Sequence, residues 1–208
     1  MKTARSAAGC MILLIIFSSA ASAGDLPKFF LSIRLAENGE SNVQGHRGLI
    51  FDSRYFLTDR FDLGLSYQLT DPQRIGMPSK IENRLSSGSI SSEATRQVCS
   101  FYSLYHPFAR DRTVDYYLGA GINLQLLHVE DIVDEDYRVT SETPPALGVS
   151  AKTGANWFFH ENIGLTLDAE VGTLFHDYSA KERHTGLSAD FKSPWLVGLL
   201  SIGISFRF

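Results

Sequence analysis

Cysteine, charge and long apolar runs are all scarce in this chain of 208 residues. It holds 2 cysteines, and only 20% of its residues are charged. The 19 Lys and Arg against 23 Asp and Glu give a net charge of −4, which supplies no basic field for a nucleic-acid backbone. The hydrophobic share of 44% is enough for a packed domain, so disordered and fibrous proteins are excluded and no nucleic-acid partner is expected.

The N-terminal segment has the pattern of a secretory signal peptide. Lys2 and Arg5 precede an apolar run over residues 11–17, and Ala-Ser-Ala at residues 21–23 forms a small-residue cleavage site. A transmembrane anchor needs about 20 apolar residues, so this run is too short to be one. We therefore expect residues 1–23 to be cleaved.

The remaining residues, 24–208, are expected to form one domain without a transmembrane helix, because no stretch in them reaches about 18 apolar residues. Cys10 precedes the apolar run, whereas a lipidated cysteine would follow it. Cleavage would remove Cys10 and leave Cys99, so no intrachain disulfide is expected. A packing role for Cys99 is the simpler interpretation than a reactive thiol.

Alternation of apolar and polar residues with a period of two dominates this domain. Leu118, Ile122 and Leu124, for example, alternate with Gly119, Gly121 and Asn123. A strand places alternate side chains on opposite faces, which a helix cannot do. The facing of residues 95–108 is ambiguous, because aromatic residues occupy both sets. The pattern predicts eight strands, over residues 29–36, 48–57, 61–69, 95–108, 116–126, 147–159, 163–173 and 200–208.

The connections alternate in length. Those at 58–60, 109–114 and 160–162 are short, and the long, polar ones cover residues 37–44, 71–94, 129–145 and 179–193. Prolines, Pro194 among them, fall at strand starts, in loops or beside a turn, so no strand centre is interrupted. This asymmetry is typical of transmembrane β-barrels. We predict an all-β, eight-stranded antiparallel transmembrane β-barrel of up-and-down topology, with both termini at the short-turn end.

Aromatic residues are concentrated at the predicted membrane interfaces, as expected for two girdles. The short-turn end receives Tyr55, Phe61, Phe108, Tyr116, Trp157, Phe159, Phe206 and Phe208, and the other end Tyr67, Phe175 and Trp195. The alternative is a soluble β-sandwich or lipocalin-like barrel, whose apolar sets would point inward. Such a protein would carry many more Lys and Glu residues.

A charge that faces lipid at mid-depth costs about 2–4 kcal/mol, so the polar sets are expected to face the lumen. The interior then receives three cations and four anions: Arg34, Arg54 and Lys152 with Asp52, Asp62, Asp168 and Glu170. The lumen of an eight-stranded barrel is just wide enough for side chains. We therefore predict a lumen filled by a paired polar network; the alternative is a charged path for a substrate.

Several segments resemble small outer-membrane barrels of the OmpW and OmpA-like kind. They are residues 116–124 (YYLGAGINL), 147–159 (LGVSAKTGANWFF), 163–171 (IGLTLDAEV) and 203–208 (GISFRF). The last strand looks like the C-terminal signal read by the barrel-assembly machinery, with Ile202, Ile204, Phe206 and Phe208 as its residues.

The resemblance implies a monomer in the bacterial outer membrane, in contact with outer-membrane lipids and lipopolysaccharide and without a cofactor. It also implies a narrow conduit that passes small hydrophobic molecules from the outside into the membrane. A structural or surface-interaction barrel, with its long loops in adhesion, is a further interpretation.

A lipid A-modifying hydrolase is the enzymatic alternative. Deacylases of the PagL kind use a His and a Ser near the outer end of a late strand, and His176 with Ser179 is the candidate pair here, Glu170 preceding them. A Ser nucleophile needs a base at hydrogen-bond distance. The spacing H-x-x-S departs from the H-x-S of those deacylases and separates the two faces of a strand, unless the chain turns after His176.

No metal site is predicted. An acidic run in the third long loop has carboxylates that suit Ca²⁺ or Mg²⁺: Glu130, Asp131, Asp134, Glu135 and Asp136. It lacks the glycine of an EF-hand loop, so a solvated loop is the simpler interpretation. The six histidines are scattered, without the spacing of metal ligands.

Overall fold

A computed structural model describes residues 29–208 apart from 41–42, 71–72, 77–90, 109–112, 130–131, 134–137, 143, 183–185 and 187. The described chain forms eleven strands: β1 (Phe29–Glu40), β2 (Val43–Phe56), β3 (Phe61–Thr70), β4 (Gln73–Gly76), β5 (Ser91–Tyr105), β6 (Val114–Val129), β7 (Ile132–Val133), β8 (Arg138–Glu142), β9 (Ala146–Phe158), β10 (Ile163–Glu182) and β11 (Ser188–Arg207). No helix long and apolar enough to cross a membrane occurs in these residues.

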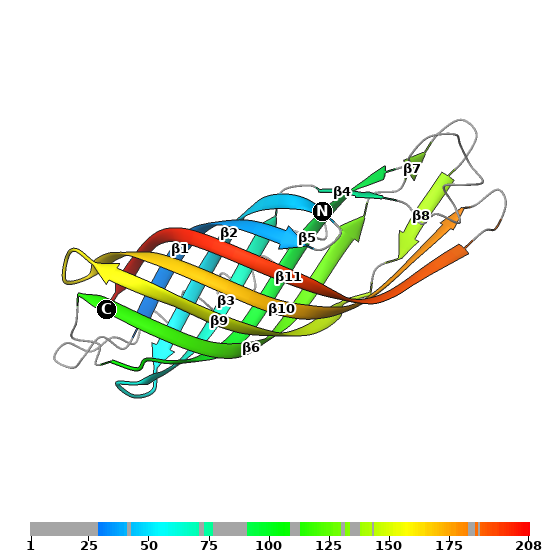
Figure 1. Cartoon of the computed structure of the whole chain (residues 1–208). Coiled ribbons are helices and arrows are strands. Elements are labelled where there is room, and N and C mark those ends of the chain that lie inside the picture. Colours follow the sequence, from blue (N-terminus) through cyan, green and yellow to red (C-terminus); the bar gives the residue numbers. More distant parts are fainter. Residues whose placement is uncertain are drawn as a thin grey trace.

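Eight of the strands close into an antiparallel barrel (Figure 1). Their order is β11-β1-β2-β3-β5-β6-β9-β10, and β10 pairs back to β11. The closing pair β1–β11 runs in register from Phe30 opposite Arg207 to Glu40 opposite Val197. Neighbours in the barrel follow each other along the chain, so the predicted fold class and its up-and-down topology are confirmed.

The two last strands are longer than predicted. β10 and β11 have 20 residues each and pair with each other as far as Lys181 opposite Ser188. The polar segments at 179–193 and 37–44, predicted as long loops, are therefore largely strand, because a partner strand can stabilise polar residues that carry no apolar alternation. Beyond the barrel, β8 pairs with the end of β10, and Figure 1 shows this extension at the end opposite the short turns.

Pro194 lies inside β11, so the expectation that every proline avoids a strand interior is wrong at this position. It stands opposite Phe175 of β10, on a stretch beyond the last described β1–β11 pair at Val197. Among the described residues, no strand pairs with that side of β11 at this position, and a residue without an N–H group is tolerated where a strand has an unpaired side.

The barrel carries its apolar side chains on the outside. On β6, Tyr116, Leu118 and Ile122 are exposed, whereas Asp115 and Tyr117 are buried in the lumen. A continuous apolar belt of this kind needs a lipid environment. The apolar belt contains Ile33, Leu35, Leu49, Phe101, Leu118, Ile122, Leu124, Leu147, Val149, Leu167, Val171, Leu196, Leu200, Ile202 and Ile204. The soluble alternative, with apolar sets pointing inward, is wrong.

β5 was ambiguous in sequence, and the structure decides its facing. Tyr102 and Leu104 are buried in the lumen, and Phe101 is exposed to the outside. Tyr102 packs against Gly64 of β3, where any Cβ would collide with the Tyr102 ring. A glycine on the neighbouring strand thus makes room for an aromatic ring inside the barrel.

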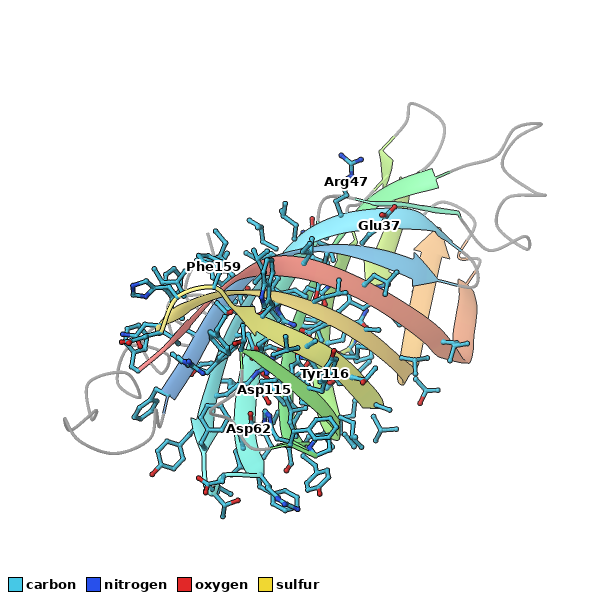
Figure 2. The ribbon with its side chains drawn as sticks, turned by 60° about the vertical axis from the view of Figure 1, so that its left-hand side comes forward. Glu37, Arg47, Asp62, Asp115, Tyr116 and Phe159 are labelled. Atoms are coloured by element: carbon cyan, nitrogen blue, oxygen red, sulfur yellow. The ribbon has the colours of Figure 1, made fainter. Side chains whose placement is uncertain are left out.

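The belt is bounded by aromatic rings at the short-turn end, where Tyr116 and Phe159 are exposed. Figure 2 shows Phe159 near one end and Glu37 with Arg47 toward the other, and these two charged residues stand opposite each other on β1 and β2. From Tyr55 to Arg47, β2 spans about 20 Å along the membrane normal, at about 3.3 Å per residue and a tilt of about 40°. This distance is close to the apolar thickness that such barrels present to lipid.

Tyr67, predicted to belong to the second girdle, is not exposed to lipid. Tyr67 is buried, and its hydroxyl donates a hydrogen bond of 3.0 Å to Gln97 Oε1. The side chains of Phe175 and Trp195 lie outside the described residues.

Candidate functional site

The inner half of the lumen, which is the half nearer the short turns, is built around Asp52 of β2. Its Oδ2 atom accepts a hydrogen bond of 3.0 Å from Arg54 Nε and lies 3.2 Å from Arg34 Nη2. The hydroxyl of Tyr102 donates to its other oxygen, Oδ1. All four side chains are buried, so one carboxylate holds two guanidinium groups away from water.

Asp168 of β10 is the second carboxylate of this network. It forms an ion pair with Arg34, lies 3.5 Å from Lys152 Nζ and has its Oδ1 atom 3.9 Å from Arg54 Nη2. The carboxylates of Asp52 and Asp168 thus bind the same cations from two sides. Removal of either one would leave a buried cation without a full complement of charge, which is costly.

Aromatic rings complete the inner network. The guanidinium of Arg54 lies between the rings of Phe30, at 4.4 Å, and Tyr117, at 4.3 Å, and Nη2 donates to the Tyr117 hydroxyl at 3.1 Å. Lys152 Nζ lies 4.3 Å above the ring of Tyr102. Cations over ring faces gain a further electrostatic attraction when both are shielded from water.

A second cluster lies at the short-turn end, around His106. Its Nδ1 is 2.7 Å from Asp115 Oδ1 and its Nε2 is 3.0 Å from Asp62 Oδ2, and the ring is fully buried. Asn156 donates to Asp115 at 3.2 Å and accepts from Thr166 at 2.9 Å.

His106 lies one residue beyond the end of β5, outside the spanning strands. Burial by itself lowers the pKa of His106, but the hydrogen bonds and charges of Asp115 and Asp62 outweigh it and raise that pKa above 6.5.

The seven lumenal residues that the sequence singles out are divided among three places. Arg34, Asp52, Arg54, Lys152 and Asp168 meet in the inner network, Asp62 belongs to the His106 cluster, and Glu170 lies farther out. Sequence reasoning missed Tyr102, Tyr117, His106 and Asp115. Asp115 and Tyr117 occupy positions of β6 that alternate with its lipid-facing residues. This alternation was the sequence signal that could have identified them as lumenal.

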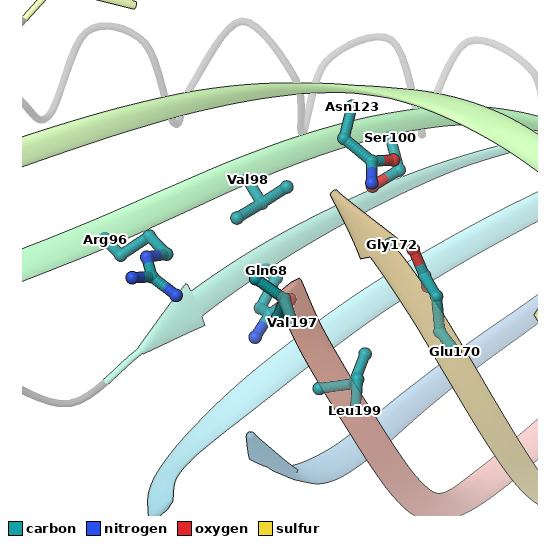
Figure 3. A pocket seen from close by; sticks show the side chains of 9 residues that line it. All are labelled: Gln68, Arg96, Val98, Ser100, Asn123, Glu170, Gly172, Val197 and Leu199. Carbon is teal, nitrogen blue, oxygen red and sulfur yellow. The ribbon is translucent and has the colours of Figure 1, made fainter. Parts of the chain in front are cut away.

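Farther from the short turns than the inner network, the lumen contains a pocket with a cavity volume of about 30 Å³ (Figure 3). It is bounded by polar and apolar side chains together. The outer pocket is lined by Gln68, Arg96, Val98, Ser100, Asn123, Glu170, Gly172, Val197 and Leu199.

The last strand places its four apolar residues on one face. Ile202, Ile204 and Phe208 are exposed and Phe206 is partly exposed. The backbones of Phe208 and Phe29 exchange hydrogen bonds of 2.8 and 3.1 Å, which closes the barrel at the short-turn end. Recognition of this strand by the assembly machinery stays a prediction.

His176 and Ser179 both lie in β10, which pairs without a break with β11 from Ile163 to Lys181. The chain therefore does not turn after His176, and two positions three apart fall on opposite faces of the strand. Their side chains lie outside the described residues.

The signal peptide at 1–23 and the acidic residues Glu130, Asp131, Asp134, Glu135 and Asp136 also lie outside the described residues. Within the part that the structure describes, no group of three or more His, Cys, Asp and Glu side chains is arranged to hold a metal ion.

No protein-family model matches the chain, and neither does any curated protein. Solved structures do. OprG from Pseudomonas aeruginosa, an outer-membrane protein, is similar with a TM-score of 0.62 and 13% identity, over 89% of this chain and 98% of OprG. Neisserial surface protein A is similar with a TM-score of 0.59 and 16% identity, over 87% of this chain and 97% of that protein.

The outer-membrane protein AlkL, determined in lipid bilayers, is similar with a TM-score of 0.52 and 17% identity, over 91% of this chain and 94% of AlkL. At these identities the likeness concerns the fold, and the apolar belt independently requires a bilayer. The chain thus has the fold of small eight-stranded outer-membrane β-barrels, in agreement with the OmpW and OmpA-like resemblance of its sequence and with an outer-membrane location.

Proposed function

We propose that this protein is a non-enzymatic outer-membrane barrel that receives small, largely apolar molecules in the outer half of its lumen and conducts no solute through the inner half. The observation that carries this proposal is the contrast in one lumen between a filled charged network and a pocket lined in part by apolar side chains. A molecule in the outer pocket meets Val98, Val197 and Leu199 on the wall.

Contacts across the lumen support a closed inner half. Arg54 of β2 donates to Tyr117 of β6, and Tyr102 of β5 donates to Asp52 of β2, so side chains from strands on different sides of the barrel meet. The interior of an eight-stranded barrel has room for little else. A molecule that enters from outside therefore leaves by the same end or through the wall toward lipid.

Conductance in a planar lipid bilayer tests the closed half. The refolded chain is expected to give no steady conductance, whereas Arg54→Ala, which removes the central side chain of the network, is expected to give discrete current steps. Arg47→Ala is the matched control, because Arg47 lies in the same strand β2 but is exposed on its opposite face. Current steps of equal size from the wild type and from Arg54→Ala would contradict the closed lumen.

Binding of a neutral probe tests the pocket. With the protein in lipid nanodiscs, 3-phenylpropanol is expected to bind saturably, and Val98→Trp, which fills the pocket, is expected to abolish that binding. Val149→Trp places the same bulk on the lipid-facing side, where Val149 is 54% exposed, and is expected to leave binding unchanged. Equal binding by the wild type and by Val98→Trp would overturn the receiving role.

A surface-interaction role is a second candidate, supported by the extension of β10 and β11 beyond the barrel and by its pairing with β8. In-register removal of residues 179–190 is expected to preserve the heat-dependent gel mobility of a folded barrel. If the extension mediates contact between cells, the same deletion reduces aggregation of cells that display the protein. Unchanged aggregation would eliminate this candidate.

The hydrolase alternative receives no support from the strand positions of His176 and Ser179. Lipid A from cells that express the protein is expected to keep all its acyl chains in mass spectra. A loss of one acyl chain that disappears in Ser179→Ala would establish the deacylase instead.

A further inference from the structure

The inner mouth of the barrel, which is the opening of the lumen at the short-turn end, is spanned by a continuous series of hydrogen bonds. The series runs from Asp62 of β3 through His106, which follows β5, to Asp115 of β6, Asn156 of β9 and Thr166 of β10. These strands are consecutive neighbours around the barrel. Each contact therefore ties one strand to the next, across five of the eight barrel strands.

Aromatic rings fill another part of the inner mouth. Phe30 of β1, Phe56 of β2 and Phe158 of β9 form one buried cluster. The ring centroid of His106 lies 5.5 Å from that of Phe56 and 5.9 Å from that of Tyr117. His106 is thus the side chain at which the hydrogen-bonded series and the aromatic cluster meet.

Both ring nitrogens of His106 contact a carboxylate. Nδ1 lies 2.7 Å from Asp115 Oδ1 and Nε2 lies 3.0 Å from Asp62 Oδ2, and the ring is fully buried. An ionised carboxylate only accepts hydrogen bonds, so two such contacts need an N–H group on each nitrogen, which is the imidazolium form. Figure 2 shows Asp62 and Asp115 close together, away from Glu37 and Arg47.

The charges that act on the His106 ring are those of Asp115 and Asp62. Arg207 of β11 interacts electrostatically with Asp115 and is the next charge outward. The other groups around the ring are Phe56 of β2, Tyr117 of β6, Asn156 of β9, Thr166 of β10 and the Arg60 carbonyl, which accepts a hydrogen bond of 2.8 Å from His106 N. One positive charge therefore separates two buried negative charges, which repel each other once it is lost.

Burial alone lowers the pKa of His106, but the hydrogen bonds and charges of Asp115 and Asp62 outweigh it and raise that pKa above 6.5. The imidazolium therefore persists to a higher pH than in an exposed histidine. When one ring proton leaves to water, the nitrogen that lost it turns a lone pair toward a carboxylate. Within the described residues, Asp62 Oδ1 is buried and accepts no hydrogen bond, so a second loss at Oδ2 would be costly.

We propose that His106 is a proton-operated latch of the inner mouth. With a proton on each nitrogen, the ring bridges Asp62 and Asp115 and keeps the mouth closed. After one proton is lost to water, the bridge breaks and the mouth admits water and small ions. This inference rests on the proposed closed inner half, because the inner network lies in series with the mouth and keeps the wild type from conducting.

The pH dependence of conductance in Arg54→Ala tests the latch, because this variant leaves the inner mouth as the remaining barrier. In planar lipid bilayers bathed in KCl, the refolded mature chain with Arg54→Ala is expected to spend severalfold more time in current steps at about pH 9 than at about pH 6. Arg54→Ala/His106→Gln has no ring proton to lose and is expected to conduct to the same extent at both pH values.

Arg54→Ala/His160→Gln is the matched control. His160 is an exposed histidine in the short turn between β9 and β10, at the same end of the barrel. Its loss is expected to leave the pH dependence of the current unchanged.

Heat-dependent gel mobility at both pH values verifies that each variant is folded. If His106→Gln is not folded, Asp62→Asn takes its place, because it removes one of the two charges that the imidazolium bridges. Arg54→Ala/Asp62→Asn is then expected to show a smaller rise of current with pH than Arg54→Ala.

The outcomes separate the latch from the closed inner half. Current steps of equal duration at both pH values from Arg54→Ala, or none at either, would overturn the latch. A rise with pH that persists in Arg54→Ala/His106→Gln comes from another group and overturns it as well. Steps from the wild type would contradict the closed inner half, and the latch would then stand only if His106→Gln removed a pH dependence of that wild-type current.

Discussion

The inner and outer halves of the lumen are lined by the same strands, yet one is filled and the other contains a pocket. β5 contributes Tyr102 to the network and Val98 to the pocket, and β10 contributes Asp168 to the first and Gly172 to the second. Large inward side chains reach across the bore, and small ones leave space. In an eight-stranded barrel, the size of the inward side chain at each level therefore decides whether the lumen is closed.

The largest expected effect comes from the carboxylate at the centre of the filled half. Asp52→Ala leaves Arg34 and Arg54 without their shared partner and is expected to lower the free energy of unfolding by about 3–5 kcal/mol, measured in urea with lipid-reconstituted protein. The control Glu37→Ala removes an exposed carboxylate opposite Arg47 and is expected to cost less than about 1 kcal/mol. Equal losses from the two variants would mean that burial does not strengthen the inner pairs.

Close packing of the inner half is tested at Gly64. Gly64→Ala brings a Cβ into the Tyr102 ring and is expected to destabilise the barrel by about 1–3 kcal/mol. In the background of Tyr102→Leu the same change is expected to cost less, so the two substitutions should couple in a double-mutant cycle. Strict additivity would show that the collision is relieved elsewhere.

The His106 cluster at the inner end predicts a pH dependence. Because the folded-state pKa of His106 is raised above 6.5 by Asp115 and Asp62, its stabilisation is complete below about pH 6.5 and is lost as the pH rises through that folded-state pKa. The free energy of unfolding is expected to fall over this range, and His106→Gln is expected to flatten the profile. Parallel profiles for the two proteins would remove His106 as the cause.

The smallest expected effect is at the outer pocket. Val98→Leu adds one methylene group next to the pocket and is expected to change the free energy of unfolding by less than about 1 kcal/mol. Leu104→Phe adds bulk at a fully buried position of the inner half, on the same face of β5, and is expected to destabilise by about 1–3 kcal/mol. A larger loss from Val98→Leu than from Leu104→Phe would reverse the comparison.

Sequence reasoning was strong where apolar and polar residues alternate strictly. On β6 it separated Leu118 and Ile122 from Asn123, and the structure has these on opposite faces. It was weak on β5, where Tyr102 and Leu104 are apolar and face the lumen beside Arg96 and His106. Hydrophobicity cannot assign the face of an aromatic residue whose ring packs over a glycine in the lumen. Arg96, Tyr102 and His106 share one face of the strand, but the sequence does not show which face this is until one of them is known to be lumenal.

The sequence alone determined the number of barrel strands, their antiparallel order and the face that meets lipid, because a bilayer accepts one side of a period-two pattern and rejects the other. The tertiary structure decided which polar groups meet. Arg54 and Tyr117 are 63 residues apart and touch only because the barrel closes. The tertiary structure also decided that β10 and β11 extend past the barrel and that Arg96 borders a pocket. Strand pairing and empty space both depend on residues far away in the sequence, which no local pattern specifies.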